Sequence, residues 1–124
     1  MERLRDYSES ARALIIGSIW GFWHFPLILK GYNFPENPEL GVLMMMASCI
    51  SLSLILNLLK EKTKTAFAPA IFHGSLNNFI WLSLAPLTGN MNSFRVGLFG
   101  LSGIISSLVV FFFLKTLTAS KKST

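Results

Sequence analysis

The sequence predicts an all-α fold, specifically a polytopic membrane bundle of about four transmembrane helices. Of its 124 residues, 52% are hydrophobic and only 14% are charged, and the mean hydropathy is +0.53. Soluble domains carry about 25% charged residues. The charges also lie in short strips between long apolar runs, each close to the 17–25 residues that a helix needs to cross a bilayer. The four predicted spans cover residues 13–29, 41–59, 67–86 and 95–114.

The first predicted helix, residues 13–29, follows a cytoplasmic lead-in at residues 1–12. Pro26 falls in its last turn and has no N–H to donate to the carbonyl of Phe22. The missing hydrogen-bond donor predicts a kink in the helix beside His24. The connection that follows, residues 30–40, is rich in glycine, asparagine and proline, which indicates a loop.

The second predicted helix, residues 41–59, ends in the charged strip KEKTK. Pro69 lies near the start of the third, residues 67–86, where the first helical turn tolerates proline. The fourth covers residues 95–114. It is followed by a basic tail, residues 115–124, which we expect to be disordered.

The basic residues predict the orientation in the membrane. The net charge is +5, and the cations concentrate in the lead-in, in the strip after the second helix and in the tail. This alternation fits four crossings with both termini cytoplasmic. Membrane lipids with anionic headgroups are the expected partners of these strips. Nucleic acid is not an expected partner, because the charges form no continuous stripe and no binding motif is present.

His24 and His73 are the only histidines, and each lies inside an apolar run. A titratable ring in a membrane span costs a few kcal/mol unless it faces a protein interior or a wet cavity. Each histidine is therefore a candidate for a functional site. The alternative is that either one only forms a hydrogen bond with a neighbouring helix.

Helical spacing predicts on which face of its helix each histidine lies. Gly17 and Gly21 lie on the same side of the first helix as His24, and glycines at this spacing let another helix approach closely. His73 and Asn77 are four residues apart and project from one face of the third helix. Asn78 lies about 100° further round and is the less favoured partner.

Other polar and aromatic residues in the spans have structural interpretations. We expect four polar residues of the second helix to form interhelical hydrogen bonds, namely Ser48, Ser51, Ser53 and Asn57. The tryptophans, Trp20, Trp23 and Trp81, are expected in packing or at the membrane interface. The single cysteine, Cys49, is expected to fill space in the core or against lipid.

His24 and His73 could both bind a divalent metal ion, for which zinc is the expected identity. A hydrolytic zinc centre has three protein ligands and a water, with a carboxylate as base. No carboxylate lies inside an apolar run of this chain. The residues alone therefore indicate half of a metallohydrolase site.

Two segments resemble a known family. IWGFWHFPLIL at residues 19–29 and PAIFHGSLNN at residues 69–78 resemble the second and third motifs of the CPBP intramembrane metalloproteases. That family is also called CAAX prenyl protease 2 or the Abi family and includes the Rce1-like proteases. Its second motif is Phe-x-x-x-His, here with Trp20 in place of phenylalanine before His24, and its third is matched by His73-x-x-x-Asn77. The resemblance extends from about Met1 to Leu114.

The family's first motif, Glu-Glu-x-x-x-Arg, is not in the sequence. Glu2 and Glu9 do not fit it, because neither belongs to a glutamate pair with an arginine four residues later. We therefore expect this chain to be the C-terminal part of such a protease, beginning just after the first motif.

The resemblance implies a metal-dependent endopeptidase of a prokaryotic cell membrane, with a membrane-associated peptide or protein as substrate. It assigns His24, His73 and Asn77 to the catalytic site and His24 and His73 to the metal. The motif glutamate and the histidines would activate water, and His73 or Asn77 would stabilise the oxyanion. Because the glutamate is missing, we expect little or no activity from the chain alone.

Two other functions fit the same sequence. The chain could be a non-catalytic membrane protein of the same fold that acts in bacteriocin immunity or binds a partner. It could also be a small transporter subunit that uses His24 and His73 as proton or metal relays.

Overall fold

The structure, a computed structural model, describes residue 4 and residues 6–84, 94–95 and 97–120; the side chains of residues 79–84 and 120 are not described. In this part of the chain every regular element is a helix, as predicted. The helices are α1 (Glu9–Trp23), α2 (Phe25–Leu29), α3 (Pro38–Thr63), α4 (Phe67–Leu84) and α5 (Leu101–Ser120).

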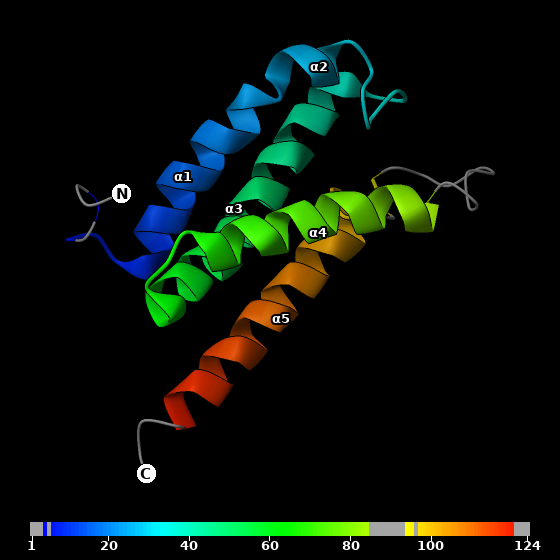
Figure 1. The fold of residues 1–124 in the computed structure, drawn as a ribbon. Coiled ribbons are helices and arrows are strands. Elements are labelled where there is room, and N and C mark those ends of the chain that lie inside the picture. Colours follow the sequence, from blue (N-terminus) through cyan, green and yellow to red (C-terminus); the bar gives the residue numbers. More distant parts are fainter. Residues whose placement is uncertain (1–3, 5, 85–93, 96, 121–124) are drawn as a thin grey trace.

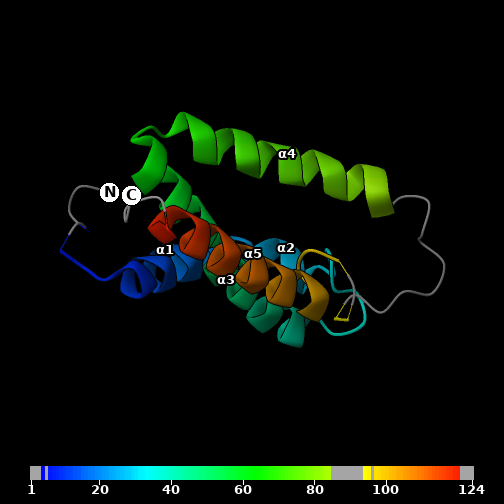
Figure 2. The same cartoon turned by 90° about the horizontal axis from the view of Figure 1, so that it is seen from below.

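Helix α3 is the centre of the molecule. Helices α1 and α5 pack along it, and α4 runs across it (Figure 1). Seen from below, α1, α3 and α5 form one group and α4 covers one side of that group (Figure 2). Because α1 and α4 both contact α3, residues of these three helices can lie close together.

Glycine allows α1 to approach α3 closely. A Cβ atom on Gly17 would overlap the backbone of Ile50, and one on Gly21 would lie 2.6 Å from the Cα of Met46. Real Cβ atoms are not found so near backbone atoms, so only glycine fits at these two positions. The predicted packing face of this helix is therefore confirmed.

The buried apolar residues form two small clusters along α3. One contains Ile28, Phe34, Met45 and Cys49, and the other contains Ile55, Leu58 and Phe111. Cys49 is fully buried and fills space in the core, in agreement with its predicted role.

The first predicted helix, residues 13–29, is divided at His24. Helix α1 ends at Trp23, His24 caps it, and α2 begins at Phe25 with Pro26 in its first turn. The missing N–H of Pro26 thus ends the helix instead of only bending it.

Helix α3 begins before residue 41, where the sequence predicted it to start. The Oδ1 atom of Asn37 accepts a hydrogen bond from the N–H of Leu40 at 3.0 Å, and Pro38 occupies the first turn. These residues, expected in a loop, are therefore an N-terminal cap. The helix continues through the charged strip to Thr63 and ends at Lys64, which has a φ of 57°.

Helix α5 is displaced toward the C-terminus relative to the predicted span at residues 95–114. It begins at Leu101, after Gly97 with a φ of +98°, and continues to Ser120. The expectation of a disordered tail is therefore wrong for residues 115–120. The end of the third predicted span, residues 85–86, and the end of the tail, residues 121–124, lie outside the described residues.

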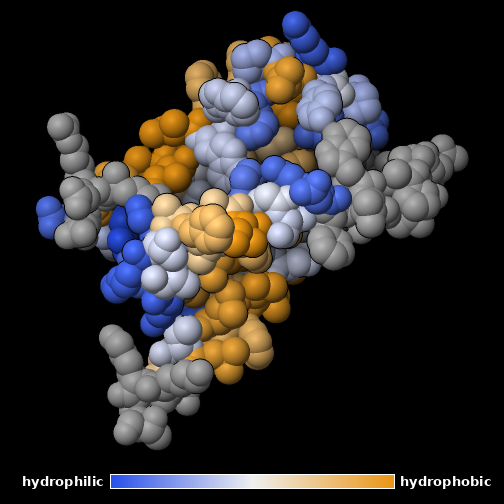
Figure 3. Space-filling model, in the orientation of Figure 1, coloured by the Kyte–Doolittle hydropathy of each residue, from blue (hydrophilic) through white to orange (hydrophobic). Residues whose placement is uncertain are grey.

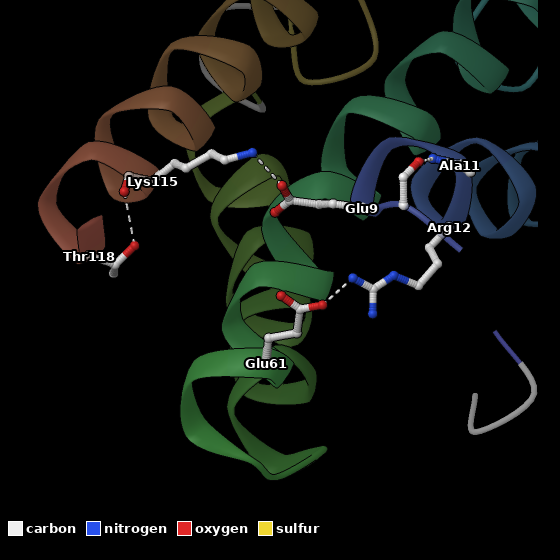
Figure 4. Close-up of polar contacts among 7 residues, drawn as sticks. Glu9, Ala11, Arg12, Glu61, Lys115 and Thr118 are labelled. Atoms are coloured by element: carbon white, nitrogen blue, oxygen red, sulfur yellow. Dashed lines mark hydrogen bonds and ion pairs between the residues drawn. The ribbon is translucent and has the colours of Figure 1, made fainter. Parts of the chain in front are cut away.

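Two ion pairs join three helix ends (Figure 4). Arg12 near the start of α1 pairs with Glu61 near the end of α3, and Glu9 on α1 pairs with Lys115 on α5. The start of α1 and the ends of α3 and α5 therefore lie at one end of the bundle.

Helices α3 and α5 are long and apolar enough to cross a membrane, with mean hydropathies of 2.2 and 1.8. Only 17% of the apolar stretch of α5 is buried within the structure, compared with 50% for α3. Figure 3 shows apolar surface over α1 and, separated from it by grey and more polar residues, along α5. A soluble monomer rarely exposes large apolar patches. The large exposed apolar side chains of this protein include Leu14, Ile19, Phe22 and Trp23 on α1 and Ile105, Val109, Phe112 and Phe113 on α5.

Candidate functional site

His24 stands at the break between α1 and α2. Its Nδ1 atom lies 2.9 Å from the carbonyl oxygen of Trp20. A carbonyl can only accept, so Nδ1 carries the proton and, in the neutral ring, Nε2 has the lone pair. Trp23 packs edge-on against the half-buried imidazole, with ring centroids 5.2 Å apart. The helix break thus fixes which nitrogen of His24 can bind a ligand or accept a proton.

His73 and Asn77 meet on one face of α4. The amide Nδ2 of Asn77 lies 3.3 Å from Nε2 of His73, in position to donate to it. The four-residue spacing argument is therefore confirmed. Asn78 instead donates to the carbonyl of Gly74 at 3.0 Å and takes no part in this pair.

The indole of Trp20 is a neighbour of both histidine rings. It meets the ring of His73 edge-on at 5.0 Å between centroids, with an interplanar angle of 80°, and lies 6.3 Å from the ring of His24. Trp20 of α1 therefore packs directly against His73 of α4. Trp20 was expected in packing or at the membrane interface, and it was also matched to the aromatic position of the second family motif, four residues before His24.

A groove of about 370 Å³ opens between α1, α3 and α4. This volume is in the range of small-ligand pockets, about 300–1,000 Å³. Most of its wall is apolar, and neither His24 nor Asn77 belongs to the lining. The lining residues are Ile16, Trp20, Ser53, Leu56, Asn57, Lys60, Ala66, Pro69, Ala70 and His73.

Two buried polar side chains of α3 line this groove, and each has one polar atom without a hydrogen-bond partner. The Oγ atom of Ser53 and the Nδ2 atom of Asn57 have none, although the residues are only 1% and 6% exposed. The expectation of interhelical hydrogen bonds is thus wrong for this pair. Ser51 donates within its own helix, to the carbonyl of Ser48. The hydroxyl of Ser48 lies 2.9 Å from the carbonyl of Met44 in its own helix and 3.0 Å from the carbonyl of Phe99. Phe99 lies in the connection before α5, so this contact leaves α3 but does not join two helices.

The donor set does not by itself fit a hydrolytic zinc ion. Such a centre needs three protein ligands and a water. Among the side chains that the structure describes, no three of histidine, cysteine, aspartate and glutamate are clustered. The Nε2 atom of His73 is also engaged by Asn77. His24 and His73 as metal ligands therefore stay a prediction that requires a further ligand.

A comparison with protein families matches residues 1–79 to the Rce1-like family, described as type II CAAX prenyl endopeptidase Rce1-like. The match covers more than half of the chain and includes His24, His73 and Asn77. The chain therefore belongs to this family, and the resemblance inferred from the two motifs is confirmed. The match ends before α5, whereas the motif-based resemblance was extended to Leu114. Neither a curated protein nor a solved structure matches the chain.

Proposed function

We propose that this chain supplies the histidine-bearing part of an intramembrane endopeptidase site that hydrolyses a peptide bond in a membrane-associated substrate. The observation that carries the proposal is the position of Trp20, which touches both His24 and His73 beside an apolar groove. Membership of a CAAX prenyl endopeptidase family supports the reaction class and a lipid-modified substrate.

The described side chains suit binding and proton handling more than water activation. His73 lines the groove, and the amide of Asn77 holds its ring in one orientation. Both groups can donate to a developing oxyanion, and Nε2 of His24 can accept a proton or orient a water. The proposal takes the general base from another segment, because the described Glu9 and Glu61 are paired with Lys115 and Arg12. Zinc held by His24 and His73 is part of the proposal only if another ligand joins them, and no step depends on it.

The proposal includes four crossings of a prokaryotic cell membrane with both termini cytoplasmic. The two ion pairs support it, because they put the start of α1 and the ends of α3 and α5 at one end of the bundle. The described cations of the basic strips include Arg12 and Lys115, which form these ion pairs, and Lys60 and Lys62 in the last turn of α3.

The test is a cleavage assay in lipid nanodiscs with a quenched fluorescent peptide that ends in a farnesylated CAAX sequence. The chain is assayed alone and fused to a family segment that carries Glu-Glu-x-x-x-Arg. We expect cleavage only by the fusion. His24→Ala and His73→Ala should each lower its rate by about 10²–10⁴-fold, the usual range for a general acid or base.

Asn78→Ala is the matched control, because Asn78 shares α4 with His73 but bonds elsewhere. It should leave the rate within a few-fold of the unsubstituted fusion. Cleavage by the chain alone, lost on His24→Ala, would contradict the inactivity proposed for it. Cleavage that survives both histidine substitutions would contradict the site.

Non-catalytic binding of a lipid-modified partner is the second candidate function. It is favoured by the lack of a clustered carboxylate among the described residues. Saturable binding of the farnesylated peptide by the fusion, with no cleavage at any concentration, would select this function over proteolysis.

A further inference from the structure

We propose that Ser53 and Asn57 bind a main-chain carbonyl of an apolar peptide segment lying in the groove between α1, α3 and α4. The two residues are one helical turn apart on α3, so their side chains are neighbours on one face. Both line the groove, both are more than nine-tenths buried, and one polar atom of each has no partner.

The unpartnered atoms define what the ligand must offer. Nδ2 of Asn57 is a donor only, and Oγ of Ser53 can donate its proton. A carbonyl oxygen has two lone pairs and can accept from both groups at once. A ligand that presents only donors would leave Nδ2 unsatisfied.

The rest of the groove defines what surrounds that carbonyl. Ile16, Trp20 and Leu56 give an apolar wall, which suits a neutral group better than an isolated carboxylate. Lys60 also lines the groove, but it already has an interaction partner. A peptide of apolar residues has this chemistry. His73 lies on α4, across the groove from α3, so a carbonyl held by the pair would be presented beside the proposed catalytic histidine.

This inference rests on the proposed peptide substrate, and it makes Ser53 and Asn57 positioning residues on a helix that carries neither family motif. Its test is binding, with no need for hydrolysis. The probe is N-acetyl-trileucine amide, compared with analogues in which one amide at a time is replaced by an E-alkene of the same shape. Binding is followed by Trp20 fluorescence in a Trp23→Phe, Trp81→Phe background in nanodiscs.

We expect the parent peptide to bind about tenfold more tightly than one of the alkene analogues, since the analogue cannot accept from buried donors. In Asn57→Leu this preference should fall to about threefold, the part that Ser53 still provides, while the affinity for the alkene analogue is kept. Ser53→Ala, a smaller change that removes a single oxygen, should reduce the preference by about threefold. Ser51→Ala is the matched control, because Ser51 bonds to the carbonyl of Ser48 and does not line the groove.

Equal binding of the parent and every alkene analogue by the unsubstituted chain would overturn the proposal. So would an unchanged preference in both Asn57→Leu and Ser53→Ala. A preference that depends on Asn57, with no cleavage by the fusion described above, would contradict the proposed proteolysis and leave the carbonyl site standing.

Discussion

Trp20 carries more of the site than its place in an apolar run suggests. Its indole contacts the rings of both His24 and His73 and forms part of the groove wall. The family motif has phenylalanine at this position, so an aromatic ring of smaller size is compatible with the site. The ring therefore acts as a spacer between two helices.

Substitution of Trp20 should separate this spacer role from general packing. We expect Trp20→Ala to lower the cleavage rate of the fusion by about 10²-fold, because displacement of a catalytic group by about 1 Å has an effect of this size. Trp20→Phe should keep the rate within about tenfold. Initial rates with the quenched peptide measure both, and equal losses in the two variants would contradict the spacer role.

Asn57 provides a prediction about stability. A buried donor without a partner costs about 1–3 kcal/mol, and an apolar residue of similar shape removes that cost. Asn57→Leu should therefore raise the free energy of unfolding by about 1 kcal/mol, measured by reversible SDS-induced unfolding. Ser48→Ala, which removes a satisfied hydrogen bond to Phe99, should lower it by about 1 kcal/mol. A larger loss in Asn57→Leu than in Ser48→Ala would show that Asn57 is structural.

Residue spacing predicted one part of the site and missed another. The faces of His24 and His73 follow from helical periodicity, and the hydrogen bond between His73 and Asn77 agrees with it. The unpartnered pair, Ser53 and Asn57, could not be recognised, because spacing within one helix does not tell whether a neighbouring helix offers an acceptor. That depends on the distance of α4 from α3, which only the structure gives.

At the scale of elements, the contact between α1 and α3 depends on glycine. Gly21→Ala should lower the free energy of unfolding by about 1–3 kcal/mol, because the added methyl group meets the backbone of Met46. Gly74 on α4 is the matched control, since nothing lies within 4 Å of a Cβ placed there. Gly74→Ala should be neutral or stabilising by up to about 1 kcal/mol. Similar losses for the two variants, in the same SDS titration, would contradict close packing at Gly21.

The helix boundaries were predictable only where one residue decides them. Pro26 marked the break after α1, since its effect is local. Asn37 and Pro38 were interpreted as loop residues, although the same two residue types also begin helices. The start of α5 depends on a tight local turn, because a Cβ on Gly103 would overlap the backbone of Leu98, five residues earlier. Hydropathy alone carries no information about such a contact.

At the scale of the whole molecule, the ion pairs link the fold to the membrane. Exposed pairs of this kind contribute about 0.2–1 kcal/mol each, so they are minor terms in stability. Their value is geometric, because Arg12–Glu61 and Glu9–Lys115 identify one polar end of the bundle (Figure 4). Tyr32 lies in the connection between α2 and α3, at the other end (Figure 1).

This arrangement predicts which positions face the cytoplasm. In a Cys49→Ala background, single cysteines are introduced at three exposed positions, Tyr32, Lys64 and Ala119. A membrane-impermeant maleimide added to intact cells should label Tyr32→Cys, while Lys64→Cys and Ala119→Cys should react only after permeabilisation. The physical reason is the positive-inside bias of the strips beside Lys64 and Ala119. External labelling of both would reverse the orientation. Labelling of Lys64→Cys and Ala119→Cys from opposite sides would be incompatible with the ion pairs, because Glu9 and Arg12 lie within one turn of α1 and hold α5 and α3 at the same end.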